Sequence, residues 1–191
     1  RGASDTGTDS LNSNVRSALE RIFNEALSLT QNRAFHRPFD PDWPSPCQNK
    51  DGQWKPVNQN PPVDFTGLSN AFETEIHPDV CEYFASFWSG GLETTSKEGH
   101  VSLIQLWNKN DFERLMENLL GHALEKKRSK HQLTIFFATT ERDSELFLSI
   151  ENSTGHVLLE EPGKAPLRKV EKNLPTFLNR LTPSLLPPHI Y

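Results

Sequence analysis

The feature that most constrains the fold is an amphipathic segment at residues 111–128, DFERLMENLLGHALEKKR. Its apolar residues recur every three to four positions, the period of an α-helix: Phe112, Leu115, Met116, Leu119, Leu120, Ala123 and Leu124. Asn108 and Asp111 have the spacing of a capping box at its start. Basic residues crowd its end, where the helix dipole favours cations: Lys126, Lys127, Arg128 and Lys130. The pattern predicts a long helix with one face on the core.

The polar side of this helix is unusual. Glu113, Glu117 and Glu125 fall on one row, and Gly121 interrupts that row. A glycine inside a helix costs about 1 kcal/mol relative to alanine, and a like-charge pair four residues apart costs about 0.2–0.5 kcal/mol more. We therefore expect Gly121 to allow another segment of the chain, or a partner, to approach the helix closely. On this basis Gly121→Ala is predicted not to bring the usual gain in helix stability.

The rest of the chain predicts an α+β domain. A helix is expected over residues 11–29, short helices near 68–75 and from Pro78, strands on either side of a turn near 97–99, a central strand in LTIFFAT, a hairpin around 152–155 and a closing helix in NLPTFLNRLTP. Strands that come in hairpins, with helices before, between and after them, favour a mainly antiparallel sheet packed with helices.

A long irregular segment rich in proline occupies residues 31–66. We expect Trp43 and Trp54 to hold it against the body of the domain. Residues 1–10 are predicted to be a disordered tail, residues 11–183 a single domain, and residues 184–191 a C-terminal tail.

Composition excludes several classes of function. The chain has 191 residues and a net charge of −5, which argues against general binding of nucleic acid. Two cysteines indicate no disulfide framework, so a reducing cytoplasm fits best. No apolar run is long enough to span a bilayer and no signal peptide is evident, so direct insertion into lipid is not expected.

Charge is distributed unevenly along the chain. Between residues 61 and 100, seven acidic residues and one lysine give a net charge of −6. Residues 141–161 carry −5, whereas the last thirty residues carry +4. This asymmetry points to a cationic partner, and the alternative is an acidic surface that simply faces water.

Motifs for catalysis or cofactor binding are absent. His77 and Cys81 have a spacing that can bind a metal, but a His at the start of a helix and a small packed Cys explain them more simply. A hydrolase built on Cys47 and His122 is a further alternative, although we expect His122 on the polar side of its helix. The basic cluster at the end of that helix, which includes Lys126, has an alternative role in binding anionic lipid headgroups.

Several segments together resemble one known family. WPSPCQ, DGQWKPV, HPDV with YF shortly after, LIQLWNKNDFERLMENLLGHALEKKR, TIFFATT, NSTGHVLLEEPGKAP and NLPTFLNRLTP occur in this order. They resemble the Syd family, SecY-interacting proteins of Gram-negative bacteria, over residues 11–183. The stretch W-N-x-x-D-F-E-R-L-x-E-N-L-x-G-H is the most distinctive of them.

The resemblance implies a non-enzymatic cytoplasmic protein that attaches peripherally to the inner membrane by binding SecY. Family members are thought to regulate the Sec translocase or to sequester unassembled SecY, and to offer an acidic surface to its basic cytoplasmic loops. The candidate residues for that surface are Glu73, Glu75, Asp79, Glu82, Glu93, Glu113, Glu117 and Glu125. The wider superfamily includes immunity proteins, so an inhibitor that binds a basic toxin is the alternative function. The resemblance implies neither cofactor nor metal.

Overall fold

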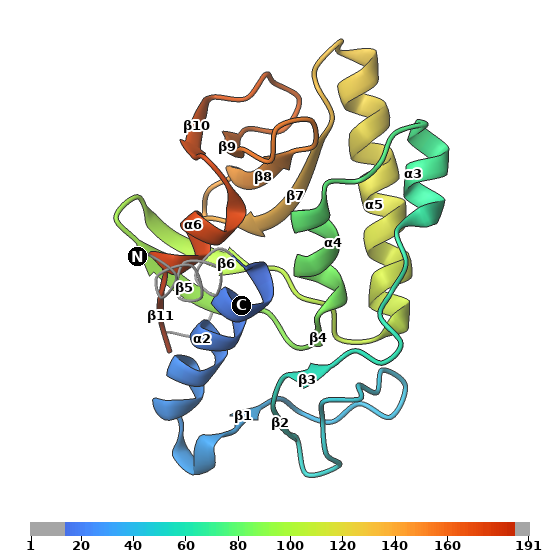
Figure 1. Cartoon of the computed structure of the whole chain (residues 1–191). Coiled ribbons are helices and arrows are strands. Elements are labelled where there is room, and N and C mark those ends of the chain that lie inside the picture. Colours follow the sequence, from blue (N-terminus) through green and yellow to red (C-terminus); the bar gives the residue numbers. More distant parts are fainter. Residues whose placement is uncertain (1–13, 186–191) are drawn as a thin grey trace, which may run out of the picture.

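The computed structural model describes residues 14–185, which form one α+β domain around a seven-stranded antiparallel sheet (Figure 1). The strand order is β10-β9-β8-β7-β6-β5-β11. The strands are β5 (Leu92–Ser96), β6 (Gly99–Leu103), β7 (Thr134–Thr139), β8 (Phe147–Glu151), β9 (Val157–Glu160), β10 (Arg168–Glu171) and β11 (Thr182–Pro183). The predicted fold class is therefore confirmed. The N-terminal tail and residues 186–191 of the C-terminal tail lie outside the described residues.

The helices pack on this sheet and on one another. They are α2 (Val15–Ser28), the 3-10 turn η1 (Gln31–Arg33), α3 (Thr66–Phe72), α4 (Pro78–Ala85), α5 (Lys109–Arg128) and α6 (Leu174–Asn179). Helix α5 packs on β7, and α2 packs on both α4 and α6. One continuous apolar core joins these elements. Among residues 14–185, no helix combines the length and apolar character needed to cross a bilayer.

Both expected hairpins are present. Strands β5 and β6 pair from Leu92 with Leu103 to Ser96 with Gly99, and β8 pairs with β9 around the turn that contains Gly155. Gly155 has a φ of +79°, which an L-residue with a side chain rarely adopts. The apolar run of β7 lies at the centre of the sheet, between β6 and β8, as the sequence predicts.

The long N-terminal segment is held at the start of α5. It contributes strands to two small sheets: β1 (Phe35–His36) pairs with β2 (Gln53–Trp54), and β3 (Val57–Asn58) pairs with β4 (Phe87–Trp88), which follows α4. Trp54 is buried and stands edge-on to Trp107, with 5.6 Å between ring centroids. The indole of Trp107 donates to the Trp43 carbonyl at 3.2 Å. The side chain of Trp43 is partly buried against the core, so the expected anchoring by Trp43 and Trp54 is confirmed.

Helix α5 begins as predicted but faces the core differently. The Asn108 side chain accepts from the Asp111 amide at 2.9 Å, and the Asp111 carboxylate accepts from the Trp107 amide at 2.9 Å. Both backbone amides at the start of the helix therefore have a hydrogen-bond acceptor. However, the buried positions include Lys126, whereas Leu120 and Leu124 are 40% and 49% exposed. The apolar stripe is wider than the strip of sheet that covers it, so part of the stripe remains in solvent.

Candidate partner-binding surface

The outer face of α5 carries the predicted row of glutamates. Glu113, Glu117, Gly121 and Glu125 are all exposed. Glu125 pairs with Arg128 at 3.1 Å. Within residues 14–185, neither Glu113 nor Glu117 forms an ion pair, although the exposed Lys109 and Arg114 lie nearby on the same helix, so both carboxylates can pair with a cation of a partner. Charges of this kind attract a cationic partner over about 8–10 Å at physiological salt.

The connection between α3 and α4 brings further acids to α5. Figure 1 shows α3 beside the second half of α5. Glu73 ends α3 in a left-handed conformation, with a φ of 51°, and is exposed. It lines a groove of about 410 Å³ together with Phe72 on its own side and Leu124 and Lys127 on α5. Glu75 is also exposed, two residues further along. The structure thus brings Glu73 to the helix that carries the glutamate row.

Three of the candidate acids interact with other residues of the protein. Glu82 accepts from the Val15 amide at 3.1 Å, at the start of α2, where the helix dipole favours an anion. Glu93 bonds to the ring of His100 and accepts from the Ser102 hydroxyl at 2.8 Å. In Figure 1 its strand, β5, lies on the side of the molecule away from α5. The structure does not place Glu93 with the acids of α5.

Asp79 is the third of these acids. Its carboxylate lies 3.9 Å from Nδ1 of His77, and that same nitrogen accepts from the Asp79 amide at 3.0 Å. Burial raises the pKa of Asp79, and the nearby His77 lowers it by a smaller amount. His77 is therefore the helix cap that the sequence suggests. Within the described chain, no three His, Cys, Asp or Glu residues are placed to hold a metal ion.

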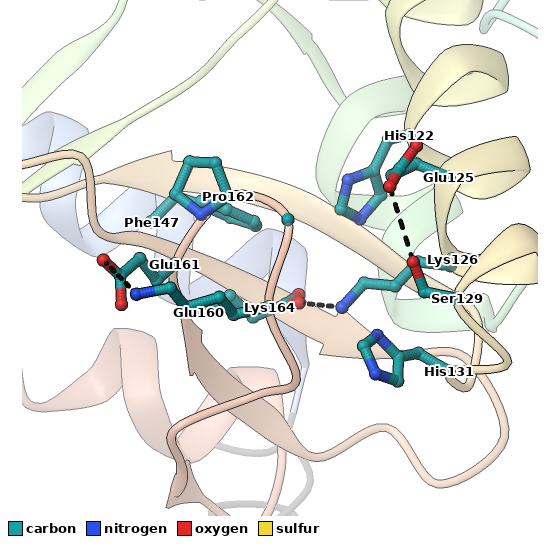
Figure 2. A pocket seen from close by; sticks show the side chains of 11 residues that line it. His122, Glu125, Lys126, Ser129, His131, Phe147, Glu160, Glu161, Pro162 and Lys164 are labelled. Atoms are coloured by element: carbon teal, nitrogen blue, oxygen red, sulfur yellow. Dashed lines mark hydrogen bonds and ion pairs between the residues drawn. The ribbon is translucent and has the colours of Figure 1, made fainter.

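The inner side of α5 contains a buried ion pair that the sequence did not reveal. Lys126 is 5% exposed and bonds to Glu160 of β9, which is fully buried (Figure 2). Burial raises the pKa of Glu160, but hydrogen bonds from Lys126 and Thr134 oppose this effect and bring the pKa below its ordinary value. The alternative in which Lys126 binds anionic lipid headgroups therefore finds no support in the structure. Three basic residues remain exposed at this end: Lys127, Arg128 and Lys130.

His122 also faces the sheet, and the expectation that it lies on the polar side of the helix is wrong. Its ring stands edge-on to Phe136 and Phe147, with centroids 5.5 and 5.7 Å away. The Thr134 hydroxyl donates its one hydrogen to Glu160 at 2.7 Å, so Nε2 of His122 must donate to Thr134 at 2.9 Å. Burial lowers the pKa of His122. These contacts fix α5 to the sheet. A pocket of about 200 Å³ lies between α5 and the sheet.

The hydrolase alternative finds no support in the geometry. Cys47 lies by the start of α5, where the Ser45 hydroxyl donates to the Trp107 carbonyl at 2.6 Å and its oxygen lies 3.0 Å from the Cys47 sulfur. His122 lies in the second half of the same helix, about 20 Å further along at 1.5 Å per residue. Burial raises the pKa of the Cys47 thiol, which disfavours the reactive thiolate. The two side chains do not form a nucleophile–base pair.

Comparisons with known proteins identify the family. The family described as "Syd protein (SUKH-2)" matches residues 16–183. "Protein Syd" of Pseudoalteromonas atlantica is 38% identical over 154 residues, 76% of this chain and 82% of the relative. "Protein Syd" of Alteromonas mediterranea is 34% identical over 175 residues, 88% of this chain and 96% of the relative. "Protein Syd" of Hahella chejuensis is 42% identical over 137 residues, 70% and 69% of the two chains. The chain belongs to the Syd family.

Proposed function

We propose that this protein binds SecY without catalysis, and that its exposed acids recognise the basic cytoplasmic loops of SecY. The observation that carries the proposal is the pair Glu113 and Glu117, which are exposed on α5 without an ion-pair partner among residues 14–185. Glu73 adds a third acid at the groove beside the same helix. Complementary charge at an interface accelerates association and selects the partner.

The exposed acids suit this role better than the engaged ones. Glu75 is exposed two residues after Glu73, and Glu125 is exposed on α5 although it pairs with Arg128, whereas Glu82 and Glu93 accept hydrogen bonds from distant parts of the protein. In the proposed role the protein attaches to the cytoplasmic side of the inner membrane through SecY rather than through lipid. It would there regulate the translocase or sequester SecY that lacks its partners.

The test is charge reversal on α5, with binding measured to SecY reconstituted in nanodiscs and with empty nanodiscs as the blank. Glu113→Lys/Glu117→Lys should weaken binding at least tenfold, because like charges then face one another, which costs about 1.4 kcal/mol or more. Association should slow most at low salt. Thermal melts check that both proteins remain folded.

The matched control is Asp143→Lys/Glu145→Lys, which makes the same change of charge at two exposed acids between β7 and β8. That connection lies by the β5–β6 hairpin, as the shared lining of a second pocket by Glu98 and Ser144 shows. Equal weakening by both double variants would contradict recognition by α5. Binding to a basic toxin, with none to SecY, would favour the immunity-type alternative.

A further inference from the structure

The outer face of α5 carries an apolar feature beside the acids. Leu120 and Leu124 are four residues apart, so their side chains are neighbours on the helix surface, and they are 40% and 49% exposed. Leu124 also lines the groove of about 410 Å³, together with Phe72 and Leu133. Single exposed leucines are common on protein surfaces, but a neighbouring pair that continues into a groove is an unusual apolar strip. We call Leu120 and Leu124 the leucine pair.

The charges around the leucine pair change sign along the helix. Glu113 and Glu117 lie one to three turns towards its start, and Glu73 lies across the groove. Lys127 and Arg128 lie beyond the pair, towards its end, where Arg128 pairs with Glu125. A bound segment that places cations over the glutamates is therefore attracted, whereas the same segment in the reverse direction meets the like charge of Lys127.

Gly121 lies between the two leucines on the helix and leaves room for a close approach. A Cβ atom added there meets no atom of the described residues within 4 Å. No other segment within residues 14–185 therefore covers the helix at this point, and the backbone of a partner can come nearer here than over a side chain. Leu124 joins the leucine pair to the groove, and Gly121 leaves the helix backbone beside the pair uncovered.

We infer that the leucine pair is the apolar centre of a docking face for an amphipathic segment of the proposed partner. An apolar side chain of that segment packs between Leu120 and Leu124 at the mouth of the groove. Its lysines and arginines lie on one side of this anchor, over Glu113 and Glu117. Apolar contact supplies most of the affinity, while the glutamates set direction and association rate. The inference rests on the proposed function and adds the chemistry of the segment that is recognised.

The test compares apolar and charge variants of the full chain against SecY in nanodiscs. Glutamine replaces leucine because it keeps a high helix propensity while it removes the apolar surface. Leu120→Gln/Leu124→Gln should weaken binding about tenfold, with the salt dependence unchanged. Glu113→Lys/Glu117→Lys should weaken binding and reduce the salt dependence. The control is Leu29→Gln, since Leu29 is 56% exposed at the end of α2.

The outcomes separate this inference from the function on which it rests. Full-strength binding by the double glutamine variant, with weakened binding by the lysine variant, would overturn the inference and leave the acidic surface in place. Full-strength binding by both would overturn the two together. Equal weakening by Leu29→Gln would also overturn the inference. Single glutamine variants with unchanged melting temperatures exclude loss of folding as the cause.

Discussion

At the scale of single residues, we expect the buried ion pair between Lys126 and Glu160 to matter most for the stability of the fold. Both side chains are at least 94% buried, and the carboxylate also accepts from Thr134 at 2.7 Å. A buried charge is tolerated only when it is paired and hydrogen-bonded, so each partner depends on the other. The sequence could not predict this pair, because a lysine at the basic end of a helix is ordinarily exposed and 34 residues separate it from Glu160.

Lys126→Met should destabilise the fold by about 3–5 kcal/mol at pH 7, because Glu160 is left charged, buried and without its cation. In the variant the hydrogen bond from Thr134 remains but the cation is gone, so burial dominates and should raise the pKa of Glu160 above its unfolded value. Protonation then favours the folded state, so the difference from the parent protein should narrow as the pH falls from 7 to 5. Urea unfolding at several pH values measures both effects.

The neighbouring lysine provides the control for this prediction. Lys127 is exposed, so Lys127→Met should change the free energy of unfolding by less than about 0.5 kcal/mol. Lys126→Met/Glu160→Gln should recover much of the lost stability, because no unpaired charge remains buried. Equal effects of Lys126→Met and Lys127→Met would show that the ion pair is not buried in solution.

At the scale of elements, sequence patterns predicted the hairpins and the long helix but not the face that α5 turns inward. Alternation identified β5, β6, β8 and β9. By contrast, β10 has the sequence RKVE and β11 has two residues, one of them proline, so neither carries an apolar pattern. The face of α5 was misjudged because the sheet offers Thr134 and Glu160 as polar partners, which favours His122 and Lys126 over Leu120 and Leu124.

Gly121→Ala tests whether anything covers the outer face of α5. The added Cβ meets nothing within 4 Å, so no segment within residues 14–185 covers Gly121 and that part of the sequence-based expectation is wrong. The variant should therefore stabilise the protein by about 0.5–1 kcal/mol, through the higher helix propensity of alanine. Urea unfolding measures the gain.

A second glycine serves as the opposite control. At Gly155 the φ is +79°, and an added Cβ would lie 2.6 Å from Nε2 of His77, so Gly155→Ala should destabilise the protein. An absence of any gain in Gly121→Ala, with the fold otherwise intact, would mean that something covers the outer face of α5 in solution.

At the scale of the whole molecule, one arginine joins distant parts of the sheet. Arg180 follows α6 and bonds to Glu98, in the turn between β5 and β6, at 2.6 Å. It also bonds to Glu171, at the end of β10, at 3.2 Å. In the strand order β10 is the first strand and β5 the sixth, so the sheet must curl to bring these acids to one guanidinium.

The sequence could predict only that part of the candidate surface whose residues lie on a single element. The row on α5 follows from helical period alone, and its members are exposed as expected. Whether Glu73 and Glu93 join that row depends on how the helices and strands pack, which no local pattern contains. The structure places Glu73 by α5 and leaves Glu93 in contact with His100 and Ser102.

The closure of the sheet predicts a specific dependence of stability on pH. The hydrogen bond from Arg180 lowers the pKa of Glu98 to about 2. A carboxylate whose pKa is lower in the folded state stabilises the protein above its unfolded pKa of about 4.3, and this contribution is lost as the pH falls towards 2. Arg180→Met keeps an apolar side chain near Phe177 but removes both ion pairs. Because these side chains are partly solvated, the variant should lose roughly 1 kcal/mol at pH 7.

The difference between Arg180→Met and the parent protein should therefore shrink between pH 4.5 and 2, and also in high salt, where exposed ion pairs are screened. Urea unfolding across this range measures it, with Glu98→Gln and the double variant completing a mutant cycle. The matched control is Arg128→Met, since Arg128 pairs with Glu125 within α5 and joins no distant elements. That variant should change stability by less than about 0.5 kcal/mol. A loss in Arg180→Met that stays constant from pH 7 to 2 would mean that the arginine acts through packing, and that the ion pairs do not close the sheet.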